Sequence, residues 1–287
     1  MDKRVYFDTN AFRAIGKALG NAALSADLRD RVLVSPLSAF EALSQLCTTQ
    51  GEEVLRQIQA IHNWVDPKRA GLLPWPDDAL GITGFGKKVM DADFTQRMQT
   101  AFNVCLAADS VESLKEEACK LRDVMDAMKL KFAQNFGRLL KAAKTEASKR
   151  ENSKEEATRQ GVPATDWFSN AWFQGIVNRL GVDPNSRSIA EIESTFNAYR
   201  EFERVKLLTA LANENYSPEK HGNDLLDAEQ LVYLGSPELH FLTCDKGFAR
   251  VEQSAQATRI IIVSPNDLSE REKVETQLRK VTDQGKS

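Results

Sequence analysis

Four acidic residues lie beside the parts of the chain that favour β-structure. Asp8 and Asp245 each directly follow a short apolar run, while Glu41 and Asp227 lie in the first turns of predicted helices. In an open α/β sheet, ligands bind outside the carboxyl ends of the strands, and residues from different strands can meet there. We therefore expect these four carboxylates to converge on one cleft at that edge of the sheet.

Carboxylates brought together without basic partners repel one another, and an isolated buried charge is costly. The predicted edge is poor in Lys and Arg partners. A hard divalent cation compensates such a cluster, because Mg²⁺ and Mn²⁺ prefer oxygen ligands and keep bound waters. The cysteines and histidines are scattered without the spacing of metal ligands, so a metal in this chain is expected to sit on oxygen atoms. Such a site suits a phosphate-bearing substrate.

Helix capping is the alternative explanation for each acid taken singly. Asp8 and Asp245 stand at predicted helix starts, and Glu41 fits a capping box. Asp224 and Asp227 fit an N-cap followed by an acid that complements the helix dipole. Capping does not explain why all four acids fall at one edge of the predicted sheet. Asp224 is either a fifth residue of the metal site or an N-cap, and the N-cap is slightly favoured.

Four short runs of β-branched, aliphatic or aromatic residues are apolar on both faces, which is typical of central strands in a parallel sheet covered by helices. Helical patterns lie between and after these runs. Strands that alternate with helices predict an α/β fold. The predicted strands are Arg4 to Phe7, Val32 to Val34, Leu239 to Thr243 and Arg259 to Val263, and the predicted helices are Asn10 to Leu19, Leu37 to Cys47, Asp224 to Leu234 and a segment after Pro265.

The middle of the chain has helical periodicity, almost no strand signal, and breaks at proline and glycine. The sheet is therefore predicted to be split by a large all-helical insertion. We expect residues 1–50 and 215–287 to form the two parts of the core, and residues 51–214 to form the insertion. Within it, Ser110 to about Gln160 predicts either one long helix or two helices with a bend near Gly137.

Each acid belongs to a short motif, and the four motifs occur in the order Val5-Tyr6-Phe7-Asp8-Thr9-Asn10, Ser35-Pro36-Leu37-Ser38-Ala39-Phe40-Glu41, Asn223-Asp224-Leu225-Leu226-Asp227-Ala228-Glu229 and Leu242-Thr243-Cys244-Asp245-Lys246-Gly247-Phe248. This ordered set resembles PIN domains, the fold of many ribonuclease toxins in bacterial toxin–antitoxin pairs. The resemblance covers roughly the first 50 and the last 75 residues. The long helical insertion departs from the simple toxins of that family.

The PIN resemblance implies an endonuclease that hydrolyses phosphodiester bonds with a metal-activated water, with RNA preferred and DNA not excluded. The four acids would bind one or two Mg²⁺ or Mn²⁺ ions. Thr9, Asn10 and Thr243 are expected to orient the carboxylates or the phosphate by hydrogen bonds. For Thr9 and Asn10, a role at the helix start is an equal alternative.

A one-sided run of charge lies in the insertion, where Glu146 is the only acid among seven basic residues. Such a run is usually the solvated face of a helix. Because this run accompanies a predicted nuclease site, we expect contact with nucleic acid about as often as a merely solvated face. The basic residues are Lys129, Lys131, Arg138, Lys141, Lys144, Lys149 and Arg150.

The chain of 287 residues has a formal net charge of −3 and contains no apolar run of transmembrane length. We expect a cytoplasmic protein without a membrane partner. A protein antitoxin, another regulator or a second copy of the chain are further expected partners. The alternative to a nuclease is a non-cleaving nucleic-acid or protein binding module on the same fold, for example a toxin–antitoxin interaction protein. The complete set of four acids favours the nuclease.

Overall fold

The computed structural model describes residues 3–20, 22, 24–48, 50–62, 71–90, 92–93, 96, 100, 103–104, 107–152 and 165–283, with the backbone alone at 61, 62, 150–152, 165, 166 and 225. The strands are β1 (Arg4–Phe7), β2 (Leu239–Thr243) and β3 (Ile260–Ile262). The α-helices are α1 (Thr9–Leu19), α2 (Ala26–Arg29), α3 (Pro36–Ser44), α4 (Gly51–His62), α5 (Pro76–Phe85), α7 (Lys115–Asn152), α8 (Thr165–Leu180), α9 (Ile189–Thr195), α10 (Asn197–Leu211), α11 (Gly222–Gln230) and α12 (Arg271–Asp283). The short 3-10 helices used below are η1 (Gln45–Cys47), η4 (Pro218–His221), η5 (Leu231–Gly235) and η6 (Lys246–Val251).

The three strands form a parallel sheet in the order β1-β2-β3, with Phe7 opposite Leu242 and Leu242 opposite Ile261. The α/β class and three of the four predicted strands are thus confirmed. All of them were expected to be central, but only β2 is central in this order, while β1 and β3 lie at its two ends, and Ile262 of β3 is 37% exposed.

The predicted strand Val32 to Val34 is wrong as a strand and forms only isolated bridges. Val32 pairs with Val5, whereas Val34 pairs with Leu72. Because neighbouring residues pair with different segments, no continuous ladder develops. The segment still lies parallel to β1, so it delivers α3 to the same edge of the sheet.

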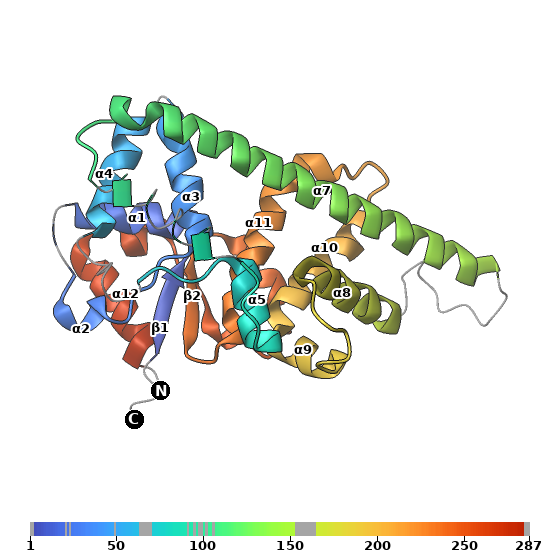
Figure 1. Ribbon diagram of the computed structural model, residues 1–287. Helices are drawn as coiled ribbons and strands as arrows, with labels where there is room; N and C mark the ends of the chain where they lie inside the picture. The colour runs from blue at the N-terminus through green and yellow to red at the C-terminus, as the bar shows by residue number, and fades with distance from the viewer. Residues whose placement is uncertain are drawn as a thin grey trace.

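Side chains alternate along a strand, so the two faces of the sheet carry different cores. In β1, Val5 and Phe7 pack into a cluster with α1, α3, α4 and α12. Tyr6, between them, packs with Phe241 of β2 into a second cluster that includes α5, α8, α9, α10 and η5. Figure 1 shows these two groups of helices on either side of β1 and β2. The helical insertion therefore supplies most of one covering layer instead of folding apart from the sheet.

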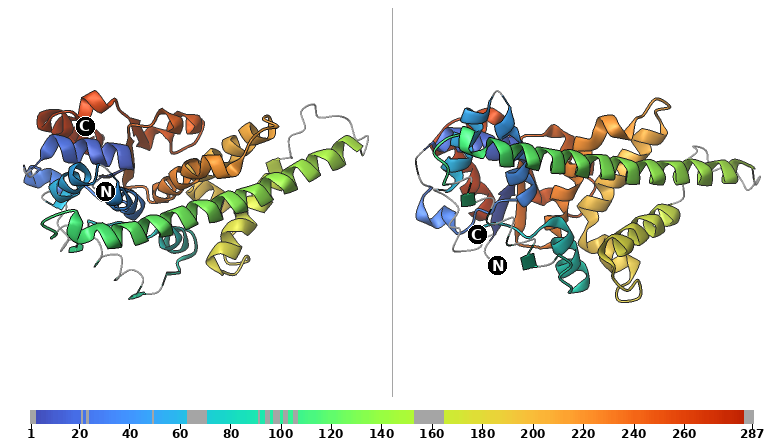
Figure 2. Two further views of the ribbon diagram at one scale, coloured as in Figure 1. Left: turned by 90° about the horizontal axis from the view of Figure 1, so that it is seen from above. Right: turned by 45° about the horizontal axis from the view of Figure 1, so that its top comes forward.

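The long basic segment forms one continuous helix, α7, of 38 residues, which settles the choice between one helix and two. Gly137 causes no break, and a Cβ built there would meet only Pro218 at 3.8 Å. Helix α7 contacts α3, η1, η4 and α11, and it runs along the body before projecting beyond α10 (Figures 1 and 2). None of the described helices is both long and apolar enough to cross a membrane.

Candidate functional site

Two of the predicted site acids end strands and accept hydrogen bonds from the backbone that follows them. Asp8 is the N-cap of α1, where its Oδ1 accepts from the Ala11 N–H at 2.7 Å. Asp245 is the N-cap of η6, where its Oδ1 accepts from the Gly247 N–H at 2.7 Å. Capping is therefore real at both positions, and it fixes one oxygen of each carboxylate.

Thr243, at the end of β2, links these two acids. Its hydroxyl donates to Asp8 Oδ2 at 2.7 Å and accepts from the Asp245 N–H at 2.9 Å. The side chain is fully buried, and the hydroxyl's partners fix its orientation. The position of Thr243 agrees with the expected role of orienting a carboxylate.

The other two acids lie on helices, beyond the first turn whose N–H groups a cap would satisfy. Glu41 is the sixth residue of α3 and Asp227 is the sixth residue of α11. The unpaired N–H groups of a helix belong to its first turn, so these carboxylates have no backbone donor of their own helix within reach. The expected capping box at Glu41 is wrong because α3 begins at Pro36, which leaves Ser38 inside the helix.

Buried hydrogen bonds align these two helices with the end of β1. The Ser38 hydroxyl of α3 donates to the Phe7 carbonyl at 2.8 Å, and Gln230 of α11 donates to the Ser38 hydroxyl at 3.0 Å. Ser38 precedes Glu41 by three residues, and Gln230 follows Asp227 by three, so each anchor lies one turn from an acid. Sequence reasoning missed this role of Ser38 and Gln230.

The residues after Asp8 differ in what they contact. The Thr9 hydroxyl donates to Glu41 Oε2 at 2.5 Å, so Thr9 joins the start of α1 to an acid of α3. Asn10 is exposed and makes no hydrogen bond to the acids that the structure describes. The structure thus brings Thr9 and Thr243 to the carboxylates, and it leaves Asn10 at the surface nearby.

Electrostatic repulsion is strongest at Asp227. Desolvation raises its pKa to about 8, and the charges of Glu41, Asp245, Asp224 and Asp8 act in the same direction. For Asp8, desolvation raises the pKa to about 6, opposed by the hydrogen bond from Thr243. The other three predicted site acids, Glu41, Asp245 and Asp8, all raise the pKa of Asp227, so their charges lie near this carboxylate.

The extra acid Asp224 is not the N-cap that we expected. The N-cap position of α11 is His221, and Asp224 lies in the first turn. Its Oδ2 lies 3.5 Å from Lys206 Nζ and 3.6 Å from His221 Nδ1. The edge is expected to be poor in Lys and Arg partners, and α10 contributes one such partner, Lys206.

Lys206 is only 3% exposed. Its ammonium also donates to the His221 carbonyl at 3.3 Å and lies 5.8 Å from the ring centroid of Phe136. Desolvation lowers its pKa to about 8, while Asp224, Asp227 and Glu203 oppose that shift. Sequence reasoning missed Lys206 because it lies in the insertion, and only the packing of α10 against α11 brings it to Asp224.

The donor set fits a hard divalent cation by its chemistry. It consists of carboxylate oxygens, and Asp227 has no hydrogen-bond donor among the residues that the structure describes. Within those same residues, no group of three or more His, Cys, Asp or Glu side chains lies close enough together to hold a metal ion. The fit therefore rests on the type and convergence of the side chains.

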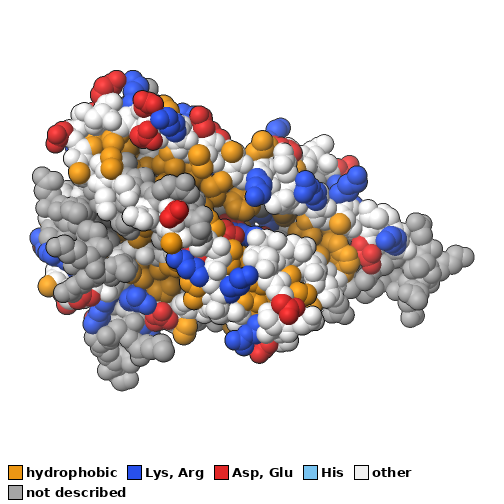
Figure 3. Space-filling view, viewed as in Figure 1, with side chains coloured by type: hydrophobic (Ala, Val, Ile, Leu, Met, Phe, Trp, Pro, Cys, Tyr) orange, Lys and Arg blue, Asp and Glu red, His pale blue; other side chains and the backbone are white. Residues whose placement is uncertain are grey.

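The predicted nucleic-acid contacts lie away from these acids, along the outer part of α7. Five of the basic side chains are exposed, and none has an ion-pair partner in the described part of the chain. Figure 3 shows Lys and Arg side chains spaced along the half of this face where α7 projects. Lys129 is half-buried near Gly222, and the side chain of Arg150 lies outside the described residues. The exposed residues are Lys131, Arg138, Lys141, Lys144 and Lys149.

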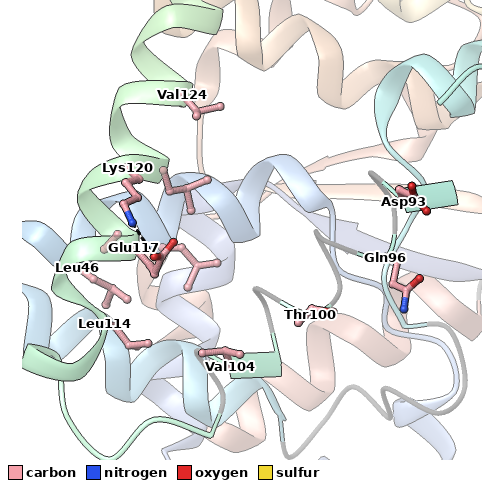
Figure 4. A pocket seen from close by; sticks show the side chains of 12 residues that line it. Leu46, Asp93, Gln96, Thr100, Val104, Leu114, Glu117, Lys120 and Val124 are labelled. Atoms are coloured by element: carbon pink, nitrogen blue, oxygen red, sulfur yellow. Dashed lines mark hydrogen bonds and ion pairs between the residues drawn. The ribbon is translucent and has the colours of Figure 1, made fainter. Parts of the chain in front are cut away.

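A separate apolar cavity of about 730 Å³ lies at the beginning of α7. Leu46, Leu114 and Val124 line it, with Glu117 and Lys120 paired at its rim (Figure 4). None of the four predicted site acids lines this cavity, so it does not belong to the acidic edge.

Comparisons with known proteins give no relative from which a function could be carried over. No protein-family model matches the chain, and no curated protein or solved structure matches it either. The PIN resemblance therefore stays a prediction based on the four motifs.

Proposed function

We propose that this protein is a metal-dependent nuclease whose site lies at the carboxyl edge of the sheet. One observation carries the proposal: acids from four separate segments meet there, and their mutual repulsion contributes to raising the pKa of Asp227 to about 8. A carboxylate whose pKa is raised in the folded protein destabilises the fold once it is ionised, so stability does not explain why it is there. Hydrolysis of a phosphate ester with a bound cation accounts for it.

In this proposal Asp8, Glu41, Asp227 and Asp245 hold Mg²⁺ or Mn²⁺, with Asp224 close by. The cation would supply an activated water and neutralise negative charge on the phosphate. Thr243 and Thr9 hold carboxylate oxygens in place through their hydroxyls. The backbone N–H groups of Ala11 and Gly247 fix the strand-end acids, so these ligands are preorganised before a substrate arrives.

RNA as the preferred substrate, a protein antitoxin or other regulator, and self-association follow from the PIN resemblance and are part of the proposal. The exposed basic face of α7 supports contact with a polyanion, because its charges are not satisfied within the described part of the chain. A non-cleaving nucleic-acid binding module is the second candidate, and the same basic face favours it.

The decisive experiment incubates the pure protein with total RNA and with single-stranded DNA in Mn²⁺, with and without EDTA. The expected result is cleavage of RNA that EDTA and Asp227→Asn both abolish. Glu252→Gln, which changes an exposed acid of the same charge, serves as the matched control and should cleave normally. RNA binding without cleavage in Mn²⁺ would favour the binding module.

Reversal of Arg138, Lys141 and Lys144 to Glu tests the contact along α7. Each lost phosphate contact should reduce the slope of log affinity against log salt by about 0.7 on a single strand. The control reverses Lys88, Arg187 and Lys280, which are exposed outside α7. Equal slopes in the wild type and both variants would identify the basic run as a solvated helix face.

A further inference from the structure

The buried Lys206 is the one cation that the described part of the insertion places in an ion pair with the acidic edge. A lysine that is 3% exposed is unusual, because burying an ammonium group is costly unless it is paired. Here the compensation comes from Asp224 at 3.5 Å, from the His221 carbonyl at 3.3 Å and from the ring of Phe136. The surroundings hold a charged ammonium in one place.

The partners of Lys206 come from the elements that build the site. Asp224 and Asp227 lie on α11, His221 immediately precedes that helix, and Phe136 belongs to α7. Lys206 therefore fixes the first turn of α11 to α10. Because the charge of Asp227 also acts on this ammonium, Lys206 contributes a positive potential at the place where the acids converge.

We propose that Lys206 is a built-in counter-ion of the acidic site and limits how tightly that site binds a divalent cation. The inference rests on the metal binding in the proposed function. Without metal, the ammonium offsets part of the repulsion among Asp224, Asp227 and the other acids. When a divalent cation enters, it meets the like charge of an ammonium that cannot move away, because its contacts hold it.

A purely structural role for Lys206 predicts the opposite change in metal affinity when this lysine is removed. If Lys206 only held α11 in place, its loss would loosen the arrangement of the acids and weaken metal binding. As a counter-ion, its loss leaves the same carboxylates with more negative potential and strengthens metal binding. The direction of the change in Mn²⁺ affinity therefore distinguishes the two roles without any measurement of cleavage.

The test measures Mn²⁺ dissociation constants at pH 7 by calorimetry on the full chain. Lys206→Met should lower the Kd by roughly 3- to 10-fold, the order expected when a unit charge several Å from a divalent ion is removed. Lys206→Arg keeps the charge and should stay within about twofold of the wild type. Lys220→Met is the control for net charge, because this exposed neighbour is screened by solvent and should also stay within about twofold.

A second comparison covers the case in which Lys206→Met does not fold. Asp224→Asn alone leaves the ammonium unpaired and should raise the Kd. In the double variant Asp224→Asn with Lys206→Met, both partners of the ion pair are replaced by neutral side chains, which folds tolerate better than a single loss. Its Kd should return towards the wild-type value.

The outcomes separate this inference from the proposed function. An unchanged or higher Kd in Lys206→Met, together with no recovery in the double variant, overturns the role of Lys206 while wild-type metal binding stands. An equal decrease of the Mn²⁺ Kd in Lys220→Met also overturns the role of Lys206, because net charge alone would then explain the change. If the wild type binds no Mn²⁺, the metal site and the role of Lys206 are both refuted.

Discussion

The strand-end acids and the helix acids of the site are held in different ways. Asp8 and Asp245 accept backbone N–H bonds at the start of a helix, so a structural role explains each of them. Glu41 and Asp227 lie beyond the first turn of their helices, where no free N–H group remains. The helix acids therefore argue for a function, and the strand-end acids are compatible with one.

The largest expected effect is on cleavage, and it tests whether the strand-end acids are more than caps. Asn caps a helix about as well as Asp does, so Asp8→Asn and Asp245→Asn keep the cap and remove only the charge. Together with Glu41→Gln and Asp227→Asn, each should lower the cleavage rate at least about 100-fold, since losses around a metal ligand already cost 10- to 100-fold. Full activity in both strand-end variants, measured on labelled RNA with unchanged circular dichroism, would leave them as caps only.

The hydroxyls that hold the acids should produce the next largest effect. Thr243→Val removes a donor to Asp8 while keeping the volume of a buried side chain, and Thr9→Val removes the donor to Glu41. Each should lower the cleavage rate by about 10-fold or more. Ser44→Ala, which removes a hydroxyl bonded to a carbonyl of α3 rather than to a carboxylate, is the control. Wild-type rates in both valine variants would show that these hydroxyls do not position the acids.

In EDTA near neutral pH, removing a strand-end acid and removing a helix acid should change the melting temperature in opposite directions. Asp245→Ala loses a cap and should be destabilised by about 1 kcal/mol, which corresponds to a melting temperature lower by a few degrees. Asp227→Ala loses repulsion and has no donor among the described residues, so its melting temperature should rise. Thermal unfolding of both variants checks the contrast. A fall at both positions would mean that Asp227 also has a stabilising role.

The sequence predicted those features of the fold that depend on short-range patterns. The apolar runs at β1 and β2 and the acid after each were found because a strand end and a cap are local signals. The predicted strand at Val32 failed because two segments compete for neighbouring residues, which no local pattern reveals. Lys206 and Gln230 were missed because their partners lie far away in the chain, and only packing of α10 and α11 brings them to the edge.

The last contrast is a dependence of stability on pH that belongs to one helix acid. The pKa of Asp227 is raised to about 8 in the fold, chiefly by burial, from the ordinary aspartate value of 3.8. Between these two values the folded state binds more protons than the unfolded state, so stability falls as pH rises from about 4 to about 8. In EDTA, the difference in melting temperature between Asp227→Asn and the wild type should therefore be near zero at pH 4 and grow in favour of the variant up to pH 8. Asp245→Asn keeps its cap and serves as the comparison. A difference that does not change with pH would show that the fold does not raise the pKa of Asp227, and the acidic edge would lose its main physical argument for a bound cation.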